Sequence, residues 1–258
     1  MSMATTPTTP ADLTPFEVPG PVTRVPSLDE LRRLTEIPDR RVVYRNVDWA
    51  FYEQLVDSIP EGSNIHVDYD GKDLEVMPNG PRHERLKGLL GDFVKVVAAA
   101  LGIPCESMSR TTWERPKIAR GVEADDCFYF LPEKLVQSAA ASERDSDDLA
   151  DYPDPDLAIE VDISRPAVDR AGIYSALKVT EIWRFEGGQV VIERLTPAGT
   201  YAAVESSGFL PVQAVEVRRW VIELATSDRT AWMERLRAEM KKKARRLARA
   251  ARRRGAAK

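Results

Sequence analysis

Three acidic residues of the sequence stand beside or within apolar runs, where a carboxylate is unusual. Asp125 comes shortly before the apolar run CFYFL, and Glu160 and Asp162 lie inside the run LAIEVDI. Side chains alternate between the two faces of a β-strand, so residues two apart share a face and lie about 6.6 Å from each other. Glu160 and Asp162 are therefore expected to place two carboxylates side by side.

Two neighbouring carboxylates on a buried strand need a compensating cation, because uncompensated charges are costly to bury. Asp125, at the start of the neighbouring predicted strand, would bring a third carboxylate to the same place. Three carboxylates that converge from two strands suit Mg²⁺ or Mn²⁺, which prefer oxygen ligands. Such an ion activates water and stabilises charge on a phosphodiester. The spacing alone equally allows an edge strand whose acids face water.

Apolar periodicity predicts the elements that would position these acids. A long helix is expected at about 82–101, with Leu86, Leu90 and Phe93 on its apolar face and Gly102 at its end. Shorter helices are expected after Ser27 and over 49–59, 167–177 and 214–225, and strands over 64–70, 74–77, 156–163, 181–185 and 189–195, with two more within 103–131. The polar, acidic stretch 132–153 is expected to be a surface loop.

The composition is that of a globular protein, with 43% hydrophobic and 30% charged residues in a chain of 258. This length fits one large domain with appendages. We expect a disordered Pro- and Thr-rich leader at 1–26, a domain at 27–225 and a basic tail at 226–258. No apolar run is long enough to cross a membrane, and the N-terminus does not resemble a secretory signal. Cys105 and Cys127 cannot form a disulfide framework or a four-sulfur zinc site, so we expect a cytoplasmic protein with reduced thiols.

Charge is distributed unevenly along the chain. Residues 229–258 contain 13 Lys and Arg against 2 Asp and Glu, which leaves 24 basic and 39 acidic residues in the rest. The tail is rich in strong helix formers and is predicted to be one long helix. Its basic residues are candidates for contacts with DNA phosphates. These candidates are Lys241, Lys242, Lys243, Arg245, Arg246, Arg249, Arg252 and Arg253. A solvated helix without a partner, or docking onto the acidic body of a neighbouring subunit in a homodimer, are the alternatives.

The two histidines stand on predicted elements near the acids. His66 lies in an alternating strand and is expected to be an exposed polar residue. His83 lies at the start of the long helix, where capping or packing is the ordinary role and holding a metal ligand or moving a proton is the alternative. The sequence has no glycine-rich nucleotide-binding motif, which argues against hydrolysis of nucleoside triphosphates and against NAD chemistry.

Six segments, in this order between about Trp49 and Pro211, resemble the Uma-type family of restriction-endonuclease-like proteins: YDGKDLEVMPNGPRHERL, SRTTWERP, RGVEADDCFYFL, PDPDLAIEVDI, DRAGIYSALKVTEIWRF and TYAAVESSGFLP. That family belongs to the PD-(D/E)xK nuclease superfamily. The resemblance implies an α/β (α+β) fold of the restriction-endonuclease type, in which helices flank a central mixed β-sheet and the acids lie on core strands. The basic C-terminal helix would follow this core.

The resemblance also implies a metal-dependent endonuclease that acts on DNA. Asp125 matches the Asp of the family's PD pair, and Glu160 matches the acid of the (D/E)xK motif. Glu84 matches an acid that members of the superfamily often contribute to the metal. Asp162 stands where the superfamily has a lysine and would instead be a further metal ligand. Arg170, in the next predicted helix, would then be the cation that stabilises phosphate charge, although a guanidinium that stays protonated is a poor general base.

The missing lysine leaves a second hypothesis open. In that hypothesis the chain keeps the nuclease fold without catalysis. It then binds nucleic acid or a partner protein through its basic C-terminal helix.

Overall fold

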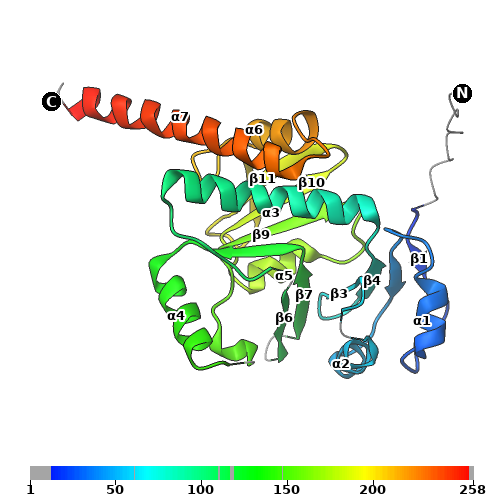
Figure 1. Cartoon of the computed structure of the whole chain (residues 1–258). Coiled ribbons are helices and arrows are strands. Elements are labelled where there is room, and N and C mark those ends of the chain that lie inside the picture. Colours follow the sequence, from blue (N-terminus) through cyan, green and yellow to red (C-terminus); the bar gives the residue numbers. More distant parts are fainter. Residues whose placement is uncertain (1–12, 61, 110, 117–118, 147, 256–258) are drawn as a thin grey trace, which may run out of the picture.

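The computed structural model describes residues 13–255 with the exception of 61, 110, 117–118 and 147, and describes no side chains beyond Arg249. The described residues form two mixed six-stranded sheets (Figure 1). The first sheet has the order β1 (Phe16–Glu17), β2 (Val42–Tyr44), β4 (Leu74–Pro78), β3 (Ile65–Tyr69), β7 (Arg120–Ala124), β6 (Thr111–Arg115). The second has the order β12 (Tyr201–Val204), β11 (Gln189–Leu195), β10 (Glu181–Glu186), β9 (Leu157–Asp162), β8 (Asp126–Tyr129), β5 (Glu106–Ser107).

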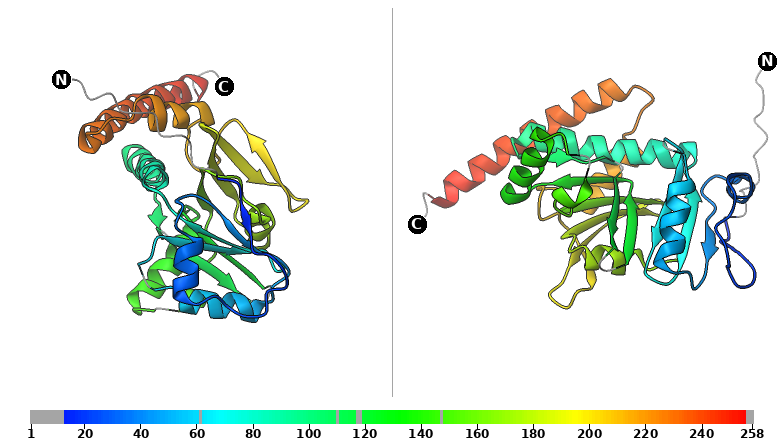
Figure 2. Two further views of the ribbon diagram at one scale, coloured as in Figure 1. Left: turned by 90° about the vertical axis from the view of Figure 1, so that its right-hand side faces the viewer. Right: turned by 90° about the horizontal axis from the view of Figure 1, so that it is seen from below.

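Helices flank both sheets (Figures 1 and 2). The helices are α1 (Leu28–Leu34), α2 (Trp49–Ser58), α3 (Pro81–Leu101), α4 (Pro132–Glu143), α5 (Arg170–Ala176), α6 (Ala214–Arg218) and α7 (Arg229–Gly255), with the short turns η2 (Leu149–Asp151) and η3 (Arg219–Glu223). The long helices α3 and α7 lie side by side over the second sheet, while α1 and α2 lie against the first. The predicted fold class, mixed β-structure flanked by helices and followed by a long C-terminal helix, is therefore confirmed.

Local sequence signals explain where α3 begins and ends. Pro81 occupies the first turn, where its missing N–H costs nothing. Gly102 ends the helix in the left-handed conformation at φ 67°, which glycine adopts without a steric penalty. Between them, Leu86, Leu90 and Phe93 are buried in the core, as the periodicity predicts. The helix is thereby fixed against the sheet that carries the acids.

In the described chain, apolar side chains form three clusters. One lies between the second sheet and helices α3, α6 and α7. Another lies between the first sheet and helices α1 and α2. The third joins α5 to strands β7 to β10, so it connects the two sheets. The short segment that connects β7 to β8 therefore lies at the junction of the two sheets.

The C-terminal helix α7 buries one face of its first half, whereas its second half is largely exposed. Trp232, Leu236 and Met240 are fully buried, and the indole Nε1 of Trp232 donates a hydrogen bond of 3.0 Å to the carbonyl oxygen of Trp220. Beyond Met240 the helix extends past the body of the protein (Figures 1 and 2). Its exposed basic residues are Lys241, Lys242, Arg245, Arg246 and Arg249, whereas Lys243 is half-buried and pairs with Glu216. The predicted residues Arg252 and Arg253 lie outside the described side chains.

Three expectations need comment. The resemblance implied one central sheet, but the described strands form two, because β7 pairs with β3 and β6 whereas β8, which follows it directly, pairs with β9 and β5. The expected loop at 132–153 is wrong in its first half, where Pro132 and an alanine-rich run form α4. Residues 1–12 of the expected leader lie outside the described residues, and Phe16–Glu17 pair in parallel with β2.

Within the described part of the chain, no helix combines the length and apolar character that a membrane span needs.

Candidate active site

Asp125 lies where the chain passes from the first sheet to the second. Its backbone N–H donates a hydrogen bond of 3.2 Å to the carbonyl oxygen of Ile159, and the N–H of Val161 donates one of 2.8 Å to its Oδ2. Strand β8 pairs antiparallel with β9, with Asp126 opposite Ile159. The paired positions end at Asp126, and the two hydrogen bonds of Asp125 join it to Ile159 and Val161, the residues on either side of Glu160. The two acids that the resemblance assigns to the site therefore belong to neighbouring stretches of backbone.

The two faces of β9 have different surroundings. Leu157, Ile159 and Val161 belong to the apolar cluster beneath α3. Glu160 and Asp162 lie on the opposite face, as the alternation of side chains predicts, and are almost completely buried. The acids are therefore withdrawn from water, and the alternative of an edge strand with solvated carboxylates does not apply, since β9 lies between β8 and β10.

Arg170 supplies the charge that compensates these acids. Its Nη1 lies 2.6 Å from Asp162 Oδ1, its Nη2 pairs with Glu160, and its Nε lies 3.2 Å from Asp68 Oδ2. Tyr174, one helical turn further along α5, donates its hydroxyl hydrogen to Glu160. Helix α5 thus presents a guanidinium and a phenol to the acidic face of β9, and Arg170 is itself only 3% exposed.

Two further arginines complete a buried network of charges. Arg41 pairs with Glu75 on β4 and lies 2.8 Å from Asp162, and Arg184 on β10 lies 3.0 Å from the other oxygen of Asp162. Asp68, on β3, accepts a hydrogen bond of 3.2 Å from the backbone of Glu123. Burial raises the pKa of Asp68 to about 7, although Arg170 acts in the opposite direction. Sequence reasoning missed Arg41, Asp68 and Glu75, which belong to the first sheet or to the segment before it.

The two histidines flank Asp125. His83 Nε2 lies 3.1 Å from Asp125 Oδ2, and His66 Nε2 lies 3.6 Å from Oδ1. Burial disfavours the charged form of Asp125, but the contacts with His83 and His66 outweigh it, and the pKa of Asp125 lies below its usual range. The expectation that His66 is exposed is wrong, because both faces of β3 are covered and the side chain is only 2% exposed.

Glu84 lies outside this network. Its side chain accepts a hydrogen bond of 2.8 Å from Asn79, whose side-chain nitrogen lies 2.6 Å from His66 Nε2. The Glu84 side chain is 46% exposed and lies 3.6 Å from His83. A pocket of about 260 Å³ opens beside it along α3 and reaches Asp125, with Lys87 and Lys95 also in its wall.

The carboxylate oxygens suit a hard divalent cation, and Asp125 Oδ1 is buried with no hydrogen-bond donor. However, among the residues that the structure describes, no three His, Cys, Asp or Glu side chains are grouped so that they could hold a metal ion. Guanidinium groups take up the oxygens of Glu160 and Asp162 instead. In this arrangement, arginines perform the charge compensation that the sequence led us to assign to a metal.

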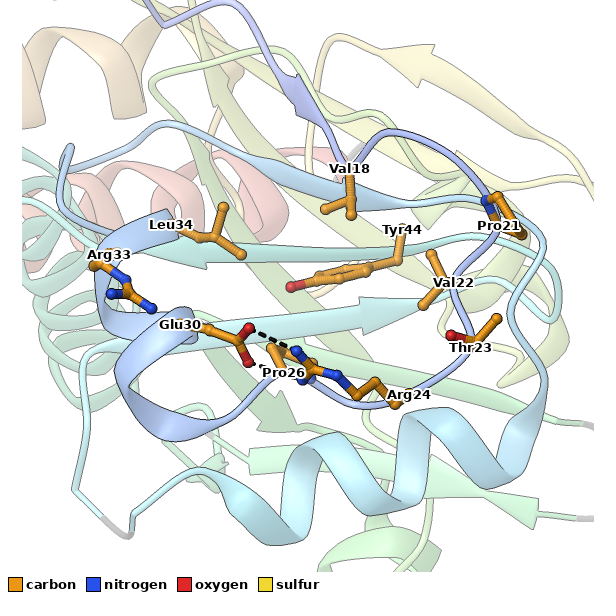
Figure 3. A pocket seen from close by; sticks show the side chains of 10 residues that line it. All are labelled: Val18, Pro21, Val22, Thr23, Arg24, Pro26, Glu30, Arg33, Leu34 and Tyr44. Carbon is orange, nitrogen blue, oxygen red and sulfur yellow. Dashed lines mark hydrogen bonds and ion pairs between the residues drawn. The ribbon is translucent and has the colours of Figure 1, made fainter.

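Another pocket, of about 360 Å³, lies far along the first sheet, between α1 and the segment that precedes it (Figure 3). Its wall is mostly apolar, with an ion pair of 2.6 Å between Arg24 and Glu30 at its side. The hydroxyl oxygen of Tyr44, which points toward it, is closed off from solvent. None of the buried acids of β9 lines this pocket, so it is separate from the candidate site.

The candidate site thus consists of buried acids on a central strand beside an aspartate at the junction of two sheets. The chain belongs to the Uma2 family, described as "Putative restriction endonuclease", whose model matches residues 49–227. The expected resemblance is thereby confirmed. A crystal structure at 1.96 Å of "a putative nuclease belonging to DUF820" from Anabaena variabilis ATCC 29413 is similar at a TM-score of 0.43 and 13% identity, and covers 68% of this chain and 99% of that chain. No curated protein matches the chain.

Proposed function

We propose that this protein is an endonuclease that hydrolyses phosphodiester bonds of DNA with Mg²⁺ or Mn²⁺. The observation that carries the proposal is the place of Asp125 at the junction of the two sheets, where its hydrogen bonds join it to Ile159 and Val161, on either side of Glu160. Membership of the Uma2 family supports the reaction class.

Each residue of the site has a proposed role. Asp125 and Glu160 would hold the metal. Glu84 would be a further ligand, and Asp162 would join only after releasing Arg41 or Arg184 as well. The bound ion would activate water and stabilise the charge that develops on the phosphodiester. Arg170 would contact the phosphate once its carboxylate partners are taken up by the metal, since a guanidinium binds phosphate oxygens with two parallel hydrogen bonds.

The exposed half of α7 would add affinity for the DNA backbone. This half of the helix extends beyond an acidic body (Figure 1), so its exposed basic residues could contact phosphates without bringing the body's negative charge close to them. Contacts of this kind do not depend on base sequence.

One observation favours a second function. The arginine network already neutralises Glu160 and Asp162, and Asp162 replaces the lysine of the motif. A nuclease fold without catalysis that binds DNA or an acidic partner protein through α7 is consistent with these facts.

Cleavage of supercoiled plasmid in Mn²⁺ and in Mg²⁺ tests the proposal. We expect nicking by the wild-type protein and at least a 100-fold loss for Asp125→Asn, since a neutral amide is a poor metal ligand. Asp126→Asn is the matched control, because the neighbouring Asp126 faces α3 and Ser107 instead of the arginine network, and it should retain most of the activity. Binding without cleavage in either metal would favour the second function.

A further inference from the structure

We infer that Arg170 occupies the cation position of this site, so that a divalent metal binds Glu160 only by displacing the guanidinium. The inference rests on the proposed function in one respect, that a metal is to bind here. It adds that the wild-type protein carries a built-in competitor for that metal.

The contacts of Arg170 carry the first step. Each of its three guanidinium nitrogens lies within ion-pair distance of a different carboxylate, and the three acids come from β3 and from two positions of β9. The side chain is almost completely buried among them. A guanidinium in this geometry fills the space between the acids where a metal ion would have to lie.

The partners of the individual acids carry the second step. When Arg170 leaves, Asp162 keeps Arg41 and Arg184, at 2.8 Å and 3.0 Å. In the described part of the chain, Glu160 keeps only the hydroxyl of Tyr174. Displacement therefore exposes one carboxylate above all, that of Glu160.

The position of Asp125 carries the third step. Its hydrogen bonds join it to Ile159 and Val161, on either side of Glu160, and its Oδ1 is buried without a hydrogen-bond donor. A metal that takes over Glu160 therefore finds a second oxygen ligand beside it. Metal and guanidinium cannot both be accommodated, because two cations would face each other in a site shielded from water.

Direct measurement of Mn²⁺ binding, by calorimetry and by electron paramagnetic resonance of free Mn²⁺, tests the inference. Arg170→Gln should bind Mn²⁺ at least tenfold more tightly than the wild-type protein. Arg184→Gln is the matched control: it removes another guanidinium from Asp162 but leaves the pair of Arg170 and Glu160, so its affinity should stay within twofold of wild type. Adding Glu160→Gln to Arg170→Gln should abolish the gain.

The outcomes are decisive without any cleavage assay. Equal or weaker Mn²⁺ binding by Arg170→Gln overturns the inference, whether or not the protein proves to be a nuclease. If Arg170→Gln does not fold in the absence of metal, Mn²⁺ should restore its folded circular dichroism spectrum, and a variant that stays unfolded at saturating Mn²⁺ contradicts us. Tight Mn²⁺ binding by Arg170→Gln without plasmid nicking would instead sustain the inference and reject the proposed nuclease activity.

Discussion

At the scale of residues, the site is a problem of charge compensation in a buried place. Five carboxylates, those of Asp68, Glu75, Asp125, Glu160 and Asp162, are nearly inaccessible to water. Arginines bridge most of them, and the bridges from Arg41 to Glu75 and Asp162 and from Arg170 to Asp68 join segments far apart in the sequence. Loss of one partner from such a network is costly, because it leaves a buried charge without compensation.

Asp68 makes the charge balance depend on pH. Burial raises its pKa to about 7, against an ordinary value near 4 in an unfolded chain. Between these values the folded protein holds a proton that the unfolded chain has lost, so the free energy of unfolding falls as pH rises through this window. Asp68→Asn removes this contribution, which amounts to at most about 1.4 kcal/mol per pH unit. Urea unfolding at pH 5 and pH 7.5 measures the free energy of unfolding of both proteins. The variant should be less stable than wild type by a smaller amount at pH 7.5 than at pH 5. A difference that is the same at both pH values would contradict the prediction.

Residue types and spacing predicted part of this site. The alternation along β9 put Glu160 and Asp162 on one face, and the structure brings Arg170 to both of them. Nothing in the sequence near these residues indicated Arg41, which acts through a strand order that pairs β2 with β4. Long-range pairing of this kind depends on the assembled sheet, so local patterns could not reveal it.

At the scale of elements, α3 approaches the second sheet closely enough to require glycine. A Cβ at Gly91 would collide with the carboxylate of Asp126, whose Oδ1 accepts hydrogen bonds of 2.9 Å from Ser107 and from the backbone of Cys127. A Cβ at Gly88 would meet only the far end of the flexible Arg229 side chain, at 2.8 Å. The two glycines therefore differ in what an added methyl group must displace.

This difference predicts opposite effects of the same substitution. Alanine in a helix interior is more stable than glycine by about 1 kcal/mol, so Gly88→Ala should raise the melting temperature. Gly91→Ala has the same propensity gain, but the forced shift of Asp126 should cost about 1–3 kcal/mol, which offsets or exceeds the gain, so the melting temperature should not rise and is expected to fall. Thermal unfolding followed by circular dichroism checks the pair, and a rise of equal size in both variants would show that α3 is free to move away from β8.

The sequence predicted a helix correctly where an apolar period continued over several turns. It failed where a polar, acidic composition suggested a loop. The apolar stripe of α3 extends over five turns and fixed its bounds within one residue. In α4 the buried positions are only Ser138 and Ala141, so no apolar stripe announced a helix and the acidic residues after it suggested a loop. Two small buried side chains are enough to pack a helix against the rest of the protein, but they do not produce an apolar period in the sequence.

At the scale of the whole molecule, an acidic body carries a basic helix that extends beyond it. The buried side chains of Trp232, Leu236 and Met240 anchor the first half of α7, so the exposed half is held in a fixed direction. We call this exposed half of α7, residues 241–249, the basic arm. Because it is rigid, it loses less conformational freedom on binding than a disordered tail of the same charge. It therefore suits contact with an extended polyanion.

Neutralising the arm should weaken DNA binding in a way that salt reveals. Each phosphate contact contributes about 0.9 to the slope of log K against log salt concentration on duplex DNA. Replacing Lys241, Lys242, Arg245, Arg246 and Arg249 together by glutamine, itself a good helix former, should reduce that slope by up to about 4 and leave the fold intact. Arg32→Gln with Arg33→Gln, on the exposed face of α1, is the control and should leave the slope unchanged. Fluorescence anisotropy with a labelled duplex at several salt concentrations measures both, and an equal slope in all three proteins would mean that DNA, if it binds, contacts the acidic body and not the arm.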